Sequence, residues 1–387
     1  MRALMIAAIG LVGCGYEDGL PAPPQGGEWI EIEPAGETIC SDGSPYRFFV
    51  RGGDPERVVI DFRGGGACWD PNTCTAADVL YASRADELET FLQALDAGRI
   101  GGIFDGAADR ELAGWTIVHM PYCTGDIHWG DAVQEYLPDL TVHHKGFVNA
   151  RTVLEWVYAR YASPDTILVS GCSAGAYGAA LHSAYIADHY PGASIRVLAD
   201  SGAGIITDDF LTASLPNWNA RQNLPPFIPA LQRPVDQLSL PELYVAVGQH
   251  FPEMRLAQTG AHYDQDQIFY YTAMGGRASE WPVRFRESLE TISASLPDTF
   301  RYYVPPGPVH CVTPYPFYFE REVSGVRLSD WVEELVLSDA PPPSVACEGA
   351  ECCDDPICVE CAANGNTDLW CGFCRGWPDE WPECATP

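Results

Sequence analysis

The sequence is poor in basic residues. It has 22 lysines and arginines against 53 aspartates and glutamates in 387 residues, which gives a formal net charge of −31. No cluster of Lys or Arg interrupts this excess, so nucleic acid and anionic lipid head groups should repel the chain. Because 47% of the residues are hydrophobic and only 19% are charged, the chain can bury one large core. We therefore expect a folded protein with no nucleic-acid partner.

Long hydrophobic runs are also missing, apart from one at the N-terminus that is too short to remain as a membrane-spanning helix. Arg2 precedes this apolar run, residues 3–12, which predicts a signal peptide over residues 1–13. The run ends at Cys14 in a pattern that resembles the bacterial lipobox, and a Gly/Pro-rich tether follows over residues 14–27. We predict an exported bacterial lipoprotein, membrane-anchored at the cell envelope only through lipid on Cys14. The alternative is a plain secretory peptide with an ordinary thiol.

Cysteine, in contrast, is abundant. Fifteen cysteines are too many for a reduced cytosolic enzyme, and assigning Cys14 to lipid leaves an even number for disulfides. Eight of them fall within residues 347–387, after a Pro-rich linker over residues 339–346. Because so short a segment cannot bury enough apolar surface to form its own core, cross-links must stabilise its fold. Two C-x2-C pairs there fit a four-thiolate zinc site, but the exported location and the even total favour a disulfide module of open connectivity.

Residues 28–338 alternate short β-branched runs with longer helical patterns. This alternation predicts an α/β fold with a mostly parallel sheet and helices on both faces. The expected strands are residues 58–62, 116–120, 166–170, 195–198 and 300–304, and the expected helices are residues 147–161 and 174–190. Since no internal repeat divides this region, we expect one α/β-hydrolase-like domain over residues 28–338.

The most informative motif is G-x-S-x-G over residues 171–175, with Ser173 at its centre. It lies between an expected strand and an expected helix, where it predicts a nucleophile elbow that projects the serine hydroxyl above the sheet edge. The helix that follows adds its N-terminal dipole, which favours a developing oxyanion. The pattern alone is weak, and the strand and helix around it make it more specific.

Two further features fit the same chemistry. Consecutive glycines over residues 64–66 follow an earlier strand, where their backbone N–H groups can approach a substrate oxygen. A glycine-rich loop can also bind phosphate, but the Lys-Ser/Thr that follows the glycines in such loops is missing here. His310, on a Pro/Gly loop after the last expected strand, is the best placed of nine histidines to act as a base. Asp200 and Asp264 both satisfy the order Ser, Asp, His, and the residues alone do not separate them.

Several motifs in this order resemble the pectin acetylesterase and Notum carboxylesterase family over residues 28–335. They are the glycine loop with Cys68 and Cys74, residues 121–126, the elbow, residues 200–204, Tyr263-Asp264-x-x-Gln267 and His310-Cys311. The resemblance implies an α/β-hydrolase-like fold without metal or cofactor, acting on small acyl esters of sugars or, in Notum, on a lipid ester of a protein.

Position by position, the resemblance implies Ser173 as the nucleophile, Asp264 as the acid and His310 as the base. It also implies backbone oxyanion donors, which are Gly65, Gly66 and Ala174. Where Notum has Trp in the glycine loop, this chain has Gly66, so we expect a different shape of acyl pocket.

The other cysteines predict three bridges. Cys172 and Cys311 are each adjacent to a proposed catalytic residue, so we expect them to pair and clamp nucleophile and base together; the alternative is two small buried thiols. Cys68 and Cys74 would close a short loop beside the oxyanion glycines. The remaining pair is Cys40 with Cys123.

A few polar and aromatic residues allow a second interpretation. Asp126, His128 and the pair His143-His144 are possible metal ligands, but no third ligand has compatible spacing, so we expect polar loop residues and no metal. Two tryptophans could line a sugar-binding cleft or simply pack in the core. They are Trp129 and Trp218.

The sequence thus predicts a serine esterase that hydrolyses short acyl esters, in particular acetyl esters, of a glycan or a small molecule. The alternatives are a non-catalytic binding protein on the same fold and a lipid or protein deacylase, which needs a large apolar pocket. Because a chain with a net charge of −31 should be repelled by polygalacturonate, a neutral acetylated glycan is the better expectation. The oligomeric state stays open.

Overall fold

The computed structural model describes residues 19–107, 110, 112–234, 238–364, 369–377, 381 and 384. The expected signal peptide, residues 1–13, and the expected lipidation site, Cys14, lie outside these residues. Among the helices of the described part, none combines the length and the apolar composition needed to cross a membrane.

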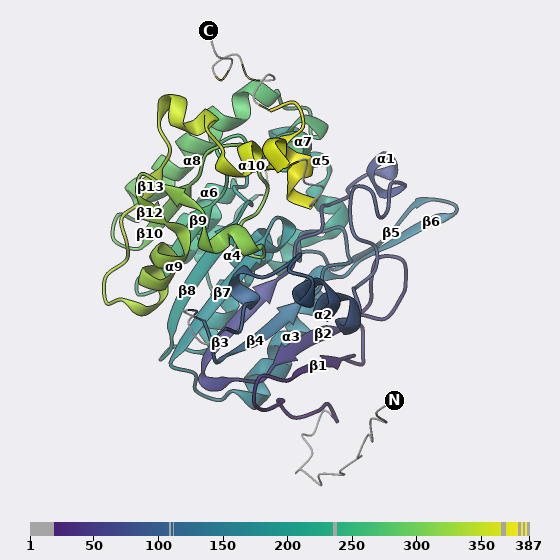
Figure 1. The fold of residues 1–387 in the computed structure, drawn as a ribbon. Helices are drawn as coiled ribbons and strands as arrows, with labels where there is room; N and C mark the ends of the chain where they lie inside the picture. Colours follow the sequence, from purple (N-terminus) through teal and green to yellow (C-terminus); the bar gives the residue numbers. More distant parts are fainter. Residues whose placement is uncertain are drawn as a thin grey trace, which may run out of the picture.

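The fold is built around a nine-stranded sheet with the order β1-β2-β4-β3-β7-β8-β9-β10-β13 (Figure 1). Its strands are β1 Trp29–Ile32, β2 Phe48–Arg51, β3 Asp54–Phe62, β4 Trp115–Met120, β7 Thr166–Cys172, β8 Ser194–Asp200, β9 Arg255–Thr259, β10 Phe300–Val304 and β13 Val345–Ala346. Neighbours from β4 to β13 are parallel, whereas β1 and β2 add an antiparallel edge. The predicted α/β fold with a mostly parallel sheet is confirmed, as are all five expected strands.

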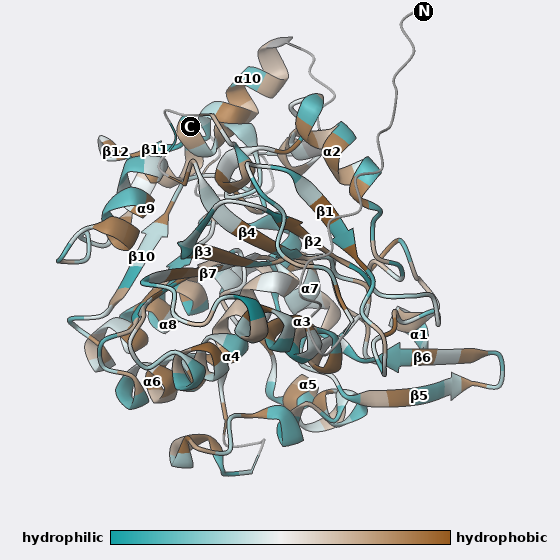
Figure 2. Cartoon of the chain, turned by 90° about the horizontal axis from the view of Figure 1, so that it is seen from below, coloured by the Kyte–Doolittle hydropathy of each residue, from teal (hydrophilic) through white to brown (hydrophobic). Residues whose placement is uncertain are grey.

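The longer helices cover the two faces of this sheet. Figure 2 shows α3, α4, α6 and α8 on one face and α2 and α9 on the other. They are α2 Leu88–Asp96, α3 Gly146–Arg160, α4 Ala174–His189, α6 Leu240–His250, α7 Gln265–Ala273, α8 Trp281–Ser295 and α9 Leu328–Leu337. The two expected helices correspond to α3 and α4. Because both faces are covered, the central strands are apolar: all six residues of β4 are buried, and β3, β4 and β7 are mostly brown in Figure 2.

Shorter elements complete the chain. The helices are α1 Pro71–Cys74, α5 Asp208–Ala213, α10 Pro356–Asn364, and the 3-10 turns η1 Gly102–Phe104, η2 Leu215–Trp218, η3 Ala220–Asn223, η4 Pro229–Leu231, η6 Ala278–Glu280, η7 Pro316–Phe319, η8 Gly349–Cys353 and η9 Leu369–Cys374. The strands are β5 Ala132–Leu137 with β6 Leu140–His144, and β11 Glu322–Val323 with β12 Val326–Arg327. The β5–β6 hairpin projects from the body of the protein (Figure 1).

The C-terminal segment joins the sheet and carries four disulfides. Within the expected linker, β13 pairs in parallel with β10, with Val345 opposite Tyr303. The disulfides are Cys347–Cys352, Cys353–Cys384, Cys358–Cys374 and Cys361–Cys371. Two of these disulfides, Cys358–Cys374 and Cys361–Cys371, join one C-x2-C pair to the other. These four cysteines are therefore not free thiolates that could bind zinc. The division into a linker and a separate module stays a prediction.

Candidate active site

Ser173 lies on a sharp turn between β7 and α4. Its φ of 57° and ψ of −124° are unusual for a residue other than glycine, which is the strained conformation expected of a nucleophile elbow. A side chain at Gly171 would overlap the carbonyl of Gly175, and one at Gly175 would overlap the carbonyl of Phe62. The two glycines of G-x-S-x-G are therefore required by the close approach of backbone to backbone.

The glycine loop runs directly beside this elbow. A Cβ added at Gly64 would lie 2.7 Å from the Cβ of Ser173, and one added at Gly65 would lie 2.6 Å from the ring of Tyr122. Gly66 has a φ of 75°, and a side chain there would overlap the carbonyl of Leu80. Gly66, Ser173 and Ala174 line one cavity, so the loop and the start of α4 border the same space.

His310 is held by Asp264. The distance from His310 Nδ1 to Asp264 Oδ1 is 2.8 Å, and Asp264 is completely buried. Asp264 also begins α7, where its Oδ1 accepts a hydrogen bond of 3.0 Å from the backbone N–H of Gln267. The Gln267 amide donates to Asp264 Oδ2 at 2.9 Å, while its Oε1 accepts from the N–H of Ala203 at 2.8 Å. Both carboxylate oxygens are thus fixed.

Asp200 has a different position. It is fully buried at the end of β8, and its Oδ2 accepts hydrogen bonds from the Val312 N–H, the Thr313 N–H and the Thr313 hydroxyl, at 2.7, 2.8 and 2.7 Å. These bonds anchor the chain that follows His310. The sequence alone could not choose between these two acids, but their contacts differ. Asp264 contacts the imidazole of His310, whereas Asp200 holds the loop that follows His310.

Three disulfides lie within residues 28–338, and two of them are next to Ser173, His310 or the glycine loop. Cys172–Cys311 joins the elbow to the loop of His310. Cys68–Cys74 closes a short loop beside the glycines, and the third bridge is Cys40–Cys123. With the four C-terminal bridges, every cysteine of the described residues belongs to a disulfide.

A second carboxylate faces His310, and the sequence reasoning missed it. Asp266 lies in the first turn of α7, and its Oδ2 is 3.9 Å from His310 Nε2. Burial alone would lower the pKa of His310, but the nearby charges of Asp264 and Asp266 raise it to about 9. Burial in turn raises the pKa of Asp266. Its position two residues beyond Asp264, at the start of a helix, was the signal available in the sequence.

The cavity beside Ser173 is apolar and roomy. Its volume of about 100 Å³ is several times what one ordered water needs. His310 and Ser173 lie on its lining, whose apolar residues include Ile205, Phe210, Leu215, Leu240, Met274 and Trp281. Trp129 and Trp218 also line it, but they are 5% and 1% exposed, so they pack as part of its wall and offer no open stacking platform.

The candidate metal ligands have other partners. Asp126 accepts hydrogen bonds from Thr124, Gly146 and His128. The rings of His128 and His144 bond backbone carbonyls, and His144 Nε2 also lies 3.0 Å from the hydroxyl of Tyr136.

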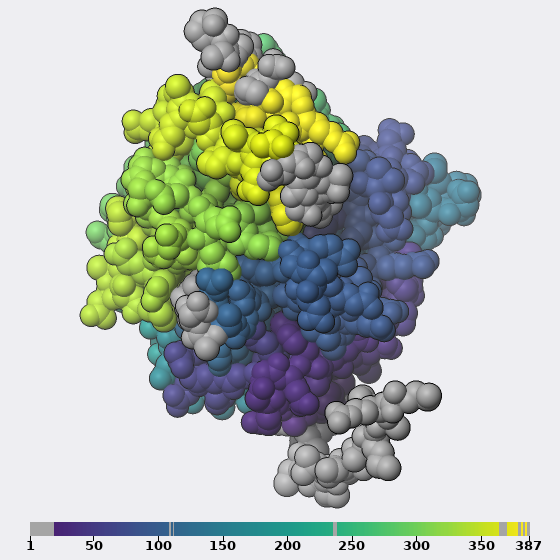
Figure 3. Space-filling model, in the orientation of Figure 1, coloured from purple at the N-terminus to yellow at the C-terminus, as the bar shows by residue number. Residues whose placement is uncertain are grey.

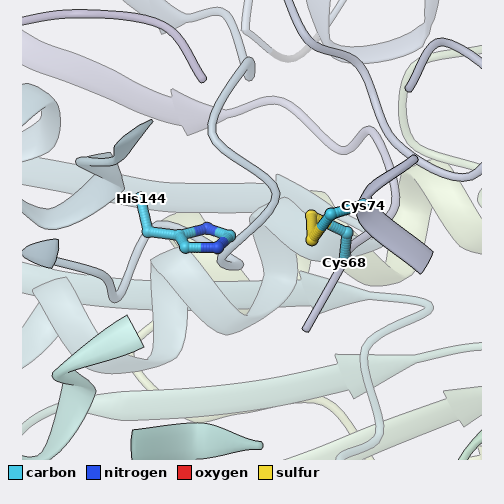
Figure 4. Close-up of side chains that lie close together, drawn as sticks. All are labelled: Cys68, Cys74 and His144. Atoms are coloured by element: carbon cyan, nitrogen blue, oxygen red, sulfur yellow. A yellow bond between two sulfur atoms is a disulfide. The ribbon is translucent and has the colours of Figure 1, made fainter. Parts of the chain in front are cut away.

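His144 also lies close to two sulfur atoms, but these form the Cys68–Cys74 disulfide (Figure 4). The same holds for His262 beside Cys347–Cys352. The donors in both groups therefore do not fit a metal site, since a disulfide sulfur is not a thiolate.

Comparison with known proteins gives one family. Residues 28–216 match the family model described as pectinacetylesterase. Among curated proteins, the chain is 25% identical to pectin acetylesterase 11 of Arabidopsis thaliana over 181 residues, which is 45% of this chain and 44% of the relative. Pectin acetylesterase 5 of the same plant is 25% identical over 180 residues, 45% and 41% of the two chains, and pectin acetylesterase 4 is 23% identical over 172 residues, 42% and 40%.

The alignments thus span less than half the length of these relatives. The family match contains the glycine loop and the elbow, and ends before Asp264 and His310. Residues 28–216 of the chain are therefore similar to the pectin acetylesterase family.

Proposed function

We propose that this protein is a serine carboxylesterase that uses Ser173, His310 and Asp264 to hydrolyse short acyl esters. The observation that carries the proposal is the position of His310, whose Nδ1 bonds buried Asp264 at 2.8 Å while its ring borders the cavity that Ser173 lines. The names of the relatives, all pectin acetylesterases, support an acetyl ester as the substrate.

The mechanism follows from the proposed roles. Ser173 attacks the ester carbonyl, and His310 takes the hydroxyl proton and returns it to the leaving alcohol. Asp264 keeps the proton on Nδ1, so that Nε2 is the nitrogen that exchanges protons with the substrate. A water molecule then repeats the sequence against the acyl enzyme and releases the acid.

The oxyanion would be stabilised by backbone N–H groups. Gly66 and Ala174 border the cavity, and Gly65 precedes them in a loop that packs against the elbow, which supports these three as the donors. Because such donors act on charge that develops only in the transition state, the loss of one costs about 10²-fold in rate.

The apolar cavity favours a second candidate, a lipid or protein deacylase. An acetyl group is small, whereas the wall of the cavity is formed by several large apolar side chains and leaves about 100 Å³ of open space. Such a space suits a longer acyl chain, since each buried methylene adds about 0.8 kcal/mol of transfer free energy. The two candidates share the catalytic residues and differ only in acyl length.

One panel separates these possibilities. Nitrophenyl acetate, butyrate and octanoate would be assayed with the wild type, with Ser173→Ala and with Ser295→Ala, which removes an exposed hydroxyl on α8. We expect Ser173→Ala to abolish turnover and Ser295→Ala to keep it. A maximum at acetate supports an acetylesterase, and one at octanoate a deacylase. The absence of any Ser173-dependent turnover would instead support a non-catalytic binding protein.

For the alcohol part, we propose a neutral acetylated glycan or a small ester. The net charge of −31 opposes the approach of a polyanion such as polygalacturonate. Hydrolysis of acetylated polygalacturonate should therefore rise with salt relative to that of a neutral acetylated xylan. A salt-independent preference for the polyanion would contradict this.

We further propose that the protein is exported and lipidated at Cys14. The seven disulfides of the described residues support an oxidising compartment. The test is the mass of the mature N-terminal peptide in a bacterial host, which should begin at Cys14 and carry acyl groups. Cys14→Ala should release the protein from the membrane fraction, and a wild-type protein that stays in the soluble fraction would contradict the proposal.

A further inference from the structure

The C-terminal segment packs on the loop that carries His310. In Figure 3 this segment, in yellow, lies over the green surface formed by the later part of the chain. The N–H of Gly307 donates to the carbonyl of Cys352 at 3.0 Å, and the N–H of Cys347 donates to Val304 at 2.9 Å. The segment therefore contacts the backbone on which the candidate base is placed.

A buried ion pair fixes this contact. Arg321 Nη1 lies 2.5 Å from Asp355 Oδ1, and the two side chains are 2% and 0% exposed. Arg321 also donates to the carbonyl of Pro306 at 2.6 Å, four residues before His310. A pair buried this deeply is costly to break, so the segment is held against the base loop in one arrangement.

Two aromatic residues of this segment reach the base and its surroundings. The ring of Phe373 is 6.0 Å from that of His310, centroid to centroid, and the ring of Trp370 is 5.7 Å from Tyr315. Both belong to η9, which the disulfides of Cys371 and Cys374 tie to α10. Trp370 and Phe373 are only half-buried.

The leaving alcohol must lie close to His310. Since Asp264 occupies Nδ1, the proton for the alcohol comes from Nε2, which places the alcohol beside the His310 ring. The apolar cavity beyond Ser173 takes the acyl group, and the described residues that line it belong to earlier parts of the chain than the C-terminal segment. A ring-shaped alcohol next to His310 would meet Phe373 and Trp370, two half-buried aromatic side chains that suit contact with an apolar ring face.

We propose that Phe373 and Trp370 form the alcohol side of the substrate site, and that the C-terminal segment thereby selects esters of ring alcohols, such as a pyranose, over esters of short aliphatic alcohols. This inference rests on the proposed esterase function. It gives the disulfide-bonded segment a role in substrate choice.

The test compares two acetyl esters that differ in the alcohol, an O-acetylated methyl xyloside and ethyl acetate. Phe373→Ala should lower kcat/KM for the xyloside by about 3- to 10-fold, the loss expected for one aromatic contact, and leave ethyl acetate within about twofold. Phe373→Tyr should retain the preference. Val359→Ala, which truncates a side chain on α10 that is 67% exposed, is the matched control and should change neither ester.

Three other outcomes have clear meanings. Equal losses on both esters would show that Phe373 only holds His310, and would overturn the proposed selection. No loss on either ester would overturn it as well. If the wild type and Ser173→Ala proved equally inactive, the esterase function itself would fail. The contact could still be tested by calorimetry, as binding of the xyloside to Ser173→Ala with and without Phe373→Ala. Equal affinities would reject the contact.

Discussion

Cys172 and Cys311 are joined by a disulfide that links the residue before Ser173 to the residue after His310. The bond closes a loop with a sequence separation of 139, and the two Cα atoms are 5.9 Å apart. It therefore connects the proposed nucleophile and the proposed base by the shortest covalent path that the fold offers, while Asp200 holds the same loop by hydrogen bonds.

The first prediction concerns this bond. The double variant Cys172→Ser/Cys311→Ser should lose about 5 kcal/mol of stability, the chain-entropy value for a loop of this length. Because a small misplacement of base against nucleophile is costly, kcat should also fall about 10- to 100-fold. Thermal unfolding and ester turnover, measured on the folded fraction, give the two values.

Cys40→Ser/Cys123→Ser is the matched control. Its sequence separation of 83 predicts a similar loss of stability, about 5 kcal/mol, but neither cysteine is adjacent in sequence to a residue that lines the cavity. Its kcat should stay near that of the wild type. Equal losses of kcat in both double variants would contradict a specific clamping role for Cys172–Cys311.

The second prediction separates the two buried acids. Asp264→Asn should lower kcat about 10³- to 10⁴-fold, because an amide no longer orients the imidazole of His310 as the carboxylate does. Its stability should also fall, by about 1 to 3 kcal/mol, because the new NH2 group would face the Gln267 amide that donates to the buried carboxylate. Asp200→Asn should cost a similar amount of stability, because its Oδ2 serves three donors of the base loop, but it should lower kcat far less. The reverse pattern in kcat would assign the acid to Asp200.

The alternation of short β-branched runs with helical patterns was enough to predict the fold, whereas the catalytic roles of the site residues stay predictions. Short β-branched runs identified five of the nine strands, because a strand buried on both faces must be apolar throughout. The strand β9, Arg255–Thr259, was missed because it contains polar residues. These residues are buried only because distant parts of the chain supply hydrogen-bond partners, such as the carbonyls to which Arg255 donates. Asp266 and Phe373 were missed for a similar reason, because their nearness to His310 depends on how distant segments pack.

The third prediction is a pH dependence of activity. His310 must be neutral to accept a proton; burial alone would lower its pKa, but the charges of Asp264, Asp266 and Asp200 raise that pKa to about 9. We therefore expect kcat/KM to rise with pH through about 9. Asp266→Asn removes one of these charges and should shift this rise downward by roughly half a unit to one unit. A profile that stays unchanged in Asp266→Asn would show that this carboxylate does not act on the base.

The same pKa predicts the pH dependence of stability. His310 has a folded pKa above its unfolded value of about 6.5. Its protonation therefore stabilises the fold fully below about pH 6.5, and this contribution is lost as the pH rises through about 9. The free energy of unfolding, measured by denaturant titration across this window, should decline less in Asp266→Asn than in the wild type. An equal decline in both proteins would mean that other groups dominate.

The last prediction tests the glycine loop. Gly66→Ala places a Cβ against the carbonyl of Leu80 at a φ of 75°, so the backbone N–H groups of the loop must move. We expect kcat to fall about 10²-fold, the cost of a lost oxyanion donor. Gly98→Ala is the matched control, because Gly98 has a similar φ of 65° but an added Cβ there would meet no atom within 4 Å. Both variants should lose about 1 to 2 kcal/mol to backbone strain, Gly66→Ala should lose more because of its overlap with Leu80, and only Gly66→Ala should also lose turnover. If Gly66→Ala kept its kcat, the oxyanion donors would have to lie elsewhere in the site.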